Sequence, residues 1–192
     1  NNDCVYVDKT ELVYRLTHTD QVYFLSRPRR FGKSLLVSTL EAYFQGKKDL
    51  FRGLAMERLE QDWESYPVLH IDFSISKYLS AHYLRSAINW FLERWEREYG
   101  CCVEDKKGTP FSVRLGNVIE SAYKKTGKAV VVLVDEYDSP MLDTNSDVAL
   151  QGELRGIMRD FFSPLKGMGQ YLRFLFITGI SKFSQMSIFS EL

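Results

Sequence analysis

One stretch of the sequence combines residue types that bind phosphate groups. It reads "FLSRPRRFGKSLL" and contains Gly32, Lys33 and Ser34, the second half of the pattern G-x-x-x-x-G-K-[ST]. In such a loop, backbone N–H groups at a helix N-terminus surround the β- and γ-phosphates, the lysine adds a positive charge and the hydroxyl binds Mg²⁺. By itself this half-match also fits a degenerate site or a chance tripeptide beside a basic patch. Together with the acidic segment described below, it predicts a site for ATP and Mg²⁺.

Arg27 stands where the pattern has its first glycine, and Pro28, which has no N–H, follows it. The phosphate donors come mainly from the later part of the loop, so an arginine here is tolerated if the backbone angles suit a non-glycine residue. The neighbouring cations are expected to serve a polyphosphate rather than DNA. The predicted phosphate-binding residues are Arg29, Arg30, Phe31, Gly32, Lys33, Ser34 and Leu35.

A second stretch, "VVVLVDEYDSP", ends an apolar segment in the acids Asp135 and Glu136. This is the form of a Walker B segment, in which the first acid holds Mg²⁺ together with the loop serine, here Ser34, and the next orients a water for attack on the γ-phosphate. The alternative is a helix-capping or turn cluster. A matching loop about a hundred residues earlier, after another apolar segment, favours the catalytic interpretation.

A third stretch, "FLFITGISKFS", places Thr178 and Ser181 after further apolar residues. Thr178 is predicted to contact the γ-phosphate or to orient the water, the alternative being a simple strand-ending turn. Asp138 either supports the Mg²⁺ ligands or caps a turn before Pro140, and the sequence leaves both open. The role of Ser181 is also open.

Apolar segments alternate along the chain with segments of helical periodicity. The strand candidates are apolar on both faces, which predicts an α/β fold with a parallel sheet covered by helices on both sides. Asp8 and Glu11 resemble a capping box, and Gly46 and Gly100 are predicted to end helices. Strands are expected at 22–26, 66–74, 129–134 and 171–181, and helices at 8–19, 33–46, 49–63, 80–99, 112–128 and 147–165.

The composition suits one globular domain over residues 1–192. Hydrophobic residues make up 45% of the chain, and 25 basic residues balance 25 acidic ones, so no global charge favours nucleic acid or a membrane surface. No apolar run approaches the roughly 20 residues that span a bilayer. Three cysteines without zinc-binding spacing favour reduced thiols in the cytoplasm, and the scattered histidines are not expected to be ligands.

Five segments together resemble the bacterial AAA-ATPase-like family, a P-loop group related to archaeal and STAND-type ATPases. They read "YVDKTELV", "YFLSRPRRFGKSLLVSTLEAYFQGKKDLF", "YPVLHIDFS", "VVLVDEYDSP" and "FLFITGISKFSQMSIFSEL". The resemblance implies that arginine at position 27 is a family variant, that Glu136 is the catalytic base, and that the sheet is of the additional-strand type, ordered five, one, four, three, two. It also implies a C-terminal restriction-endonuclease-like domain in many members.

Four strand candidates fall one short of that sheet. We therefore expect an N-terminal fragment that lacks the fifth strand and the lid, with an effector such as a nuclease in the same polypeptide and nucleic acid contacted only through it. An uncovered first strand would also favour homo-oligomers. Two rivals remain, a P-loop scaffold that does not hydrolyse ATP and, less favoured, a DNA-binding module. GTP is not excluded, although no N-K-x-D-type guanine motif follows the acids.

Overall fold

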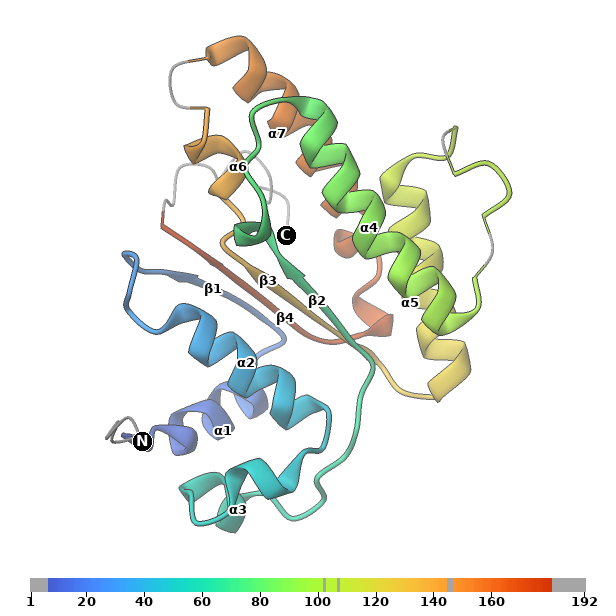
Figure 1. Cartoon of the computed structure of the whole chain (residues 1–192). Coiled ribbons are helices and arrows are strands. Elements are labelled where there is room, and N and C mark those ends of the chain that lie inside the picture. The colour runs from blue at the N-terminus through green and yellow to red at the C-terminus, as the bar shows by residue number, and fades with distance from the viewer. Residues whose placement is uncertain (1–6, 102, 107, 145–146, 181–192) are drawn as a thin grey trace.

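A parallel sheet runs through the centre of the molecule (Figure 1). The computed structural model describes residues 7–101, 103–106, 108–144 and 147–180. Within them the sheet has four strands in the order β1-β4-β3-β2. The strands are β1 (Val22–Ser26), β2 (Val68–Asp72), β3 (Val130–Asp135) and β4 (Leu172–Gly179). All three strand pairings are parallel, as the sequence predicted.

The register brings the carboxyl ends of the strands to one edge of the sheet. Asp72 is the partner of Asp135, and Ser26 is the partner of Gly179. Ligands of open α/β sheets bind outside this edge, because the loops that follow the strands converge there. The fold thus gathers the predicted site residues at one place.

Helices cover both faces of the sheet, and each face has its own apolar core. Along β3, Val131 and Leu133 pack on one side while Val130, Val132 and Val134 pack on the other, since successive strand residues face opposite ways. In Figure 1 one layer lies below and to the left of the sheet and the other above and to the right. The first layer holds α1 (Thr10–Thr19), α2 (Lys33–Phe44) and α3 (Ala55–Leu59), and the second holds α4 (Ala81–Tyr99), α5 (Phe111–Thr126) and α7 (Val148–Phe162).

The predicted stop of α4 is confirmed. Gly100 has φ 74°, a left-handed conformation that costs glycine little, and its N–H donates to the Glu96 carbonyl. Gly46, with φ 67°, follows α2 in the same conformation. These glycines set where the chain leaves each helix and turns toward the next element.

The predicted helix at 49–63 is wrong. Gly53, with φ 81°, interrupts the segment, and Trp63, with φ 43°, lies beyond its last helical residue, Leu59. The segment instead forms a short 3₁₀ turn, η1 (Lys48–Phe51), followed by α3. The sequence also missed α6 (Ser139–Leu142) and the 3₁₀ turns η2 (Phe73–Ile75), η3 (Ser163–Lys166) and η4 (Gly169–Tyr171).

The predicted capping box of the first helix is also wrong. Asp8 accepts hydrogen bonds from the N–H of Thr10 and, through its other oxygen, from the N–H of Ala55. Glu11 instead pairs with Arg15 at 2.5 Å. Asp8 therefore ties the start of α1 to the start of α3, a long-range contact that local spacing does not reveal.

None of the helices in the described part of the chain has both the length and the apolar character needed to cross a membrane.

Candidate functional site

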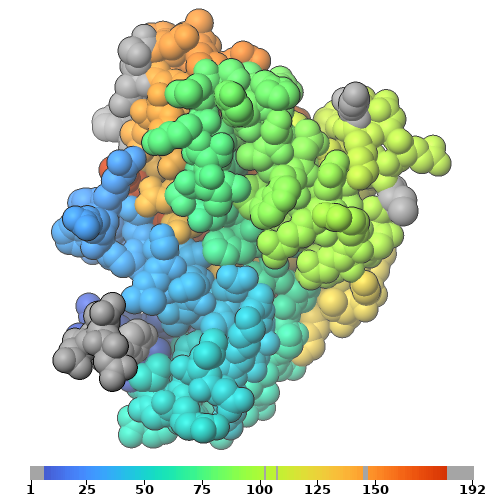
Figure 2. All heavy atoms as spheres, viewed as in Figure 1, coloured from blue at the N-terminus to red at the C-terminus, as the bar shows by residue number. Residues whose placement is uncertain are grey.

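The loop between β1 and α2 exposes the N-terminus of α2. Arg30 and Gly32 have φ values of 66° and 74°, and no side chain of the described residues caps the helix that starts at Lys33. Figure 2 shows the loop as a blue projection at the left edge of the molecule. The uncapped N–H groups and the positive end of the helix dipole make this turn suited to an anion.

Lys33 is the buried centre of the loop, with 4% of its surface exposed. Its Nζ donates to the carbonyl oxygens of Arg27 and Pro28, at 2.9 and 3.2 Å. The same Nζ lies 3.0 Å from Oε1 of Glu136. The lysine thus joins the phosphate-loop motif to the acidic motif, two stretches about a hundred residues apart in the chain.

The geometry also explains Arg27 in place of glycine. Its N–H donates to the Gly179 carbonyl at 3.1 Å and its carbonyl accepts from Lys33, so this residue works through its backbone. Arg27 is not among the described residues with positive φ, and a side chain therefore adds no backbone strain. The backbone at position 27 therefore suits a non-glycine residue, which was the condition for an arginine to be tolerated there.

Thr178 links the ends of β3 and β4. Its hydroxyl donates to Oδ1 of Asp135 and accepts from the N–H of Glu136 at 3.2 Å, while its carbonyl accepts from Tyr137 at 3.0 Å. Thr178 is fully buried and Asp135 is nearly so. Glu136 follows with φ 51°, which is unusual for a non-glycine residue and typical of functional turns.

The structure therefore brings Lys33, Asp135, Glu136 and Thr178 together at the sheet edge. Ser34 and Leu35 lie exposed on the first turn of α2, and Arg29, Arg30 and Phe31 lie exposed on the loop. Within the described residues, no cluster of three or more His, Cys, Asp or Glu side chains is arranged to hold a metal ion. A cation here would depend on Asp135, Ser34 and phosphate oxygens.

Two residues at this edge were not predicted from the sequence as part of the site. Asp72, which ends β2 beside Asp135, accepts a hydrogen bond from the N–H of Ser74 at 2.8 Å. Gly179 lies against Tyr137, whose ring carbon Cε1 would be 2.3 Å from an added Cβ. The acid at the end of "VLHID" was a signal for the first, and nothing in the sequence indicated the second.

Asp138 has a structural contact that the sequence could not define. Its Oδ2 accepts the N–H of Ile180 at 2.9 Å, and its side chain makes no capping bond to α6. Asp138 thus occupies the N-cap position of α6, as the capping alternative placed it, but its Oδ2 holds the turn after β3 against the end of β4. Ser181 lies outside the described residues.

The helix that carries Lys33 is fixed to the sheet by a polar pair. Nδ1 of His70 on β2 and Oε2 of Glu41 on α2 are 2.9 Å apart. This hydrogen bond lowers the pKa of Glu41 below its ordinary value, helped by the charges of Lys47 and Arg94. His70 thus anchors α2 to the sheet.

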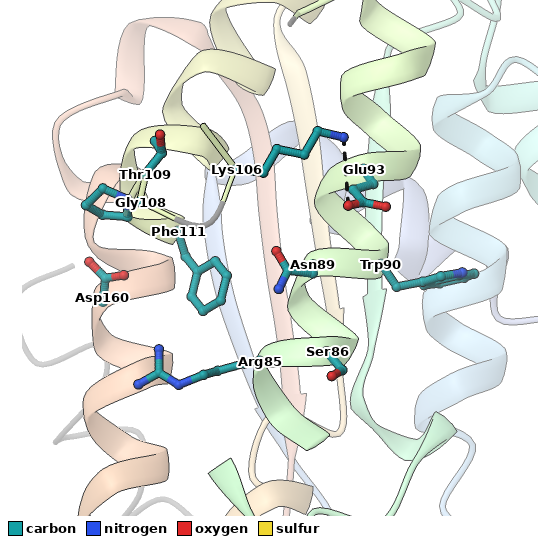
Figure 3. Close-up of a pocket in the computed structure, with 11 residues that line it drawn as sticks. Arg85, Ser86, Asn89, Trp90, Glu93, Lys106, Gly108, Thr109, Phe111 and Asp160 are labelled. Carbon is teal, nitrogen blue, oxygen red and sulfur yellow. Dashed lines mark ion pairs between the residues drawn. The ribbon is translucent and has the colours of Figure 1, made fainter. Parts of the chain in front are cut away.

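A cavity of about 690 Å³ lies in the other helical layer, that of α4, α5 and α7 (Figure 3). Arg85 and Asn89 of α4, Phe111 of α5 and Asp160 of α7 surround it, and Lys106 pairs with Glu93 at 3.7 Å across its rim. None of the predicted site residues lines it. The cavity is therefore separate from the candidate site.

Comparisons with known proteins identify the family of the chain. The model of the AAA-ATPase-like family, described as "Predicted AAA-ATPase", matches residues 1–189. The chain is also 39% identical, over its whole length, to an uncharacterized protein in the vnfD 5' region of Azotobacter chroococcum mcd 1. The chain spans 36% of that relative's length. No solved structure matches the chain.

Proposed function

We propose that this chain, a member of the family of predicted AAA-ATPases, binds ATP with Mg²⁺ at the loop before α2 and hydrolyses it. Family membership suggests nucleotide binding, and the parallel sheet flanked by helices is consistent with a P-loop NTPase-like fold. The observation that carries the proposal is the contact of Lys33 with Glu136 at 3.0 Å. It brings a phosphate-binding cation and a carboxylate suited to activating water into one site.

The first task of the site is to hold the phosphate groups. The N–H groups of the first turn of α2 point out of an uncapped helix end, and Lys33 adds the charge for the β- and γ-phosphates. The exposed Arg29 and Arg30 add positive potential around them.

The second task is to hold Mg²⁺, which when bound neutralises charge on the phosphate oxygens. Ser34 would supply a hydroxyl and Asp135 a carboxylate, a donor set of the hard oxygen type that Mg²⁺ prefers. The hydroxyl of Thr178 keeps Asp135 in place through its hydrogen bond. Thr178 is thus proposed as the positioning residue of this acid, in addition to its predicted sensing of the γ-phosphate.

The third task is to activate water. Glu136 would orient a water molecule and accept its proton as the water oxygen forms a bond to the γ-phosphorus. The bond from that phosphorus to the β–γ bridging oxygen breaks, and ADP leaves with phosphate as the second product. Glu136 is the only proposed base, and it begins in contact with Lys33.

The wider role proposed is that of a nucleotide-driven switch or motor for an effector, such as a nuclease, in the same polypeptide. The length of the Azotobacter relative, of which this chain spans 36%, leaves room for such a part. Residues 1–192 are proposed as one ATPase domain that works in the cytoplasm and forms homo-oligomers. Contact with nucleic acid would occur through the effector.

The test is titration calorimetry of the protein with ATP and Mg²⁺, followed by a phosphate-release assay. We expect Lys33→Ala to abolish binding, and Glu136→Gln to keep binding and lose turnover by at least about a hundredfold. Lys48→Ala, a change of the same type at an exposed site, is the matched control and should behave like the wild type. No binding to the wild type would refute the proposal.

The rival is a P-loop scaffold that binds ATP without hydrolysing it. It is supported by the ion pair of Lys33 with Glu136, because a carboxylate held by Lys33 is not free to accept a proton from water. The rival predicts equal effector activity with ATP and with a non-hydrolysable analogue, whereas the switch predicts that the two ligands differ.

A further inference from the structure

A row of three polar side chains crosses the carboxyl edge of the sheet. They are Thr178 of β4, Asp135 of β3 and Asp72 of β2, on strands that lie side by side in Figure 1. The hydroxyl of Thr178 donates to Asp135 from one side, and the register makes Asp72 the partner of Asp135 on the other. Paired strands lie about 4.8 Å apart, so Asp72 is the direct neighbour of the acid proposed to hold Mg²⁺.

The whole row faces the helical layer that contains α2. On each strand, the residue two positions earlier faces that layer: Phe176 and Leu133 belong to its apolar core, and His70 pairs with Glu41 of α2 at 2.9 Å. Residues two apart on a strand point to the same face of the sheet. Asp72 therefore shares its face with the loop and helix proposed to bind the phosphates.

The first turn of α2 lies toward the same place. Ser34 precedes Glu41 by seven residues, which is nearly two full turns of helix. Ser34 is therefore on the same side of α2 as Glu41, the side turned toward β2, at the helix end that begins at the carboxyl edge of the sheet. The two side chains proposed as direct Mg²⁺ ligands, Ser34 and Asp135, thus approach the position of Asp72 from the helix and from the sheet.

The carboxylate of Asp72 is held in place and keeps one oxygen open. Its Oδ1 accepts the N–H of Ser74 at 2.8 Å, and no described residue forms a hydrogen bond or ion pair with its other oxygen. Asp72 is also only partly buried, so water can reach it. Like charges on paired strands repel, and a divalent cation beside Asp72 and Asp135 would offset that repulsion.

We infer that Asp72 positions water ligands of Mg²⁺ at this site, an inference that rests on the proposed function. Mg²⁺ usually keeps several of its waters and binds through one or two carboxylates together with phosphate oxygens. Asp135 is the carboxylate proposed to bind the cation directly, and Asp72 accepts hydrogen bonds from the bound waters through its open oxygen. Asp72 is thus a positioning residue, and Glu136 keeps its proposed role as the base.

The test measures how ATP binding to the whole protein depends on Mg²⁺. Calorimetry with ATP is performed in EDTA and at a series of Mg²⁺ concentrations, and Mn²⁺, which takes the same oxygen ligands, is titrated into the ATP complex by EPR. The variants are Asp72→Asn and Asp72→Ser, which remove the charge and keep an acceptor for the N–H of Ser74. Urea denaturation checks that both stay folded. Asp62→Asn, at an exposed acid after α3, is the matched control.

We expect both Asp72 variants to need about tenfold to a hundredfold more Mg²⁺ for half of its effect on ATP affinity, and to bind Mn²⁺ more weakly by the same factor. In EDTA they should bind ATP at least as tightly as the wild type, because a negative charge beside the phosphates has been removed. Asp62→Asn should match the wild type in every measurement.

A wild-type dependence on Mg²⁺ and Mn²⁺ in both Asp72 variants would overturn the inference and leave the proposed function standing. Equal weakening of ATP binding with and without Mg²⁺ would also overturn it, because Asp72 would then support the phosphate loop rather than the cation. If the wild type binds no ATP under any of these conditions, the proposed function fails and the inference fails with it.

Discussion

While Lys33 and Glu136 form their ion pair, neither side chain is free for its proposed function, which is phosphate binding for Lys33 and water activation for Glu136. A nucleotide would have to separate the pair. Both side chains are largely buried, with 3% and 14% of their side-chain surfaces exposed. A pair in such surroundings attracts more strongly than one in water, because water screens it less. Phosphate oxygens would have to draw Lys33 away from Glu136, and the carboxylate would then be released to bind water.

From this competition we predict that Glu136→Gln binds ATP more tightly than the wild type, by about threefold to tenfold. The amide removes both a rival for Lys33 and a negative charge beside the γ-phosphate. The dissociation constant can be measured by calorimetry, with Glu120→Gln, which changes a partly exposed partner of Lys124 on α5, as the matched control. Weaker binding by Glu136→Gln would show that the ion pair does not compete with the nucleotide.

Gly179 offers a second prediction at the scale of a single residue. We expect Gly179→Ala to lower the free energy of unfolding by about 2 kcal/mol or more, because its Cβ would lie 2.3 Å from Cε1 of the buried Tyr137 ring. Urea denaturation measures the effect. Gly152→Ala in α7, where nothing lies within 4 Å, is the control. It should be neutral or stabilising by up to about 1 kcal/mol, and equal stability of the two variants would contradict the packing argument.

At the scale of elements, α4 and α5 are joined by a charged pair inside the second helical layer. Nε of Arg114, which is fully buried, donates to Oε1 of Glu96 at 2.7 Å, and its Nη1 donates to Asn89 at 2.5 Å. Lys106 lies 3.8 Å from the other oxygen of Glu96. The guanidinium has its hydrogen bonds satisfied only while this carboxylate is present.

We predict that Glu96→Gln lowers the free energy of unfolding by about 3 kcal/mol, because it leaves a buried guanidinium without its counter-charge. Asp49→Asn, which breaks an Arg52 pair at 3.0 Å with both side chains more than three-quarters exposed, should cost less than about 0.5 kcal/mol. Both values come from urea denaturation. A loss for Glu96→Gln as small as that of the exposed pair would contradict the prediction.

Over the whole molecule, the sequence predicted what depends on local pattern and missed what depends on distant partners. The strands were predictable because apolar runs such as 129–134 are too short for a typical helix, rich in β-branched residues and bounded by turn residues. The Lys33–Glu136 pair was not, since it joins motifs that meet only after the sheet has formed. Asp8 shows the same limit, because its bond to Ala55 displaced a local capping box.

The strand order also has a consequence for synthesis on the ribosome. Among the described strands, β1 pairs only with β4, and the phosphate loop is held to the end of β4 by the bond from Arg27 to Gly179. Leu172 follows Ser26 by about 150 residues, which takes on the order of ten seconds to translate. During that interval the nascent first strand has no neighbour in the sheet, so its open edge has to be shielded by α1 and α2 or by a chaperone. The proposed nucleotide-binding loop is translated early, but the strand that holds its first residue is available only when β4 emerges.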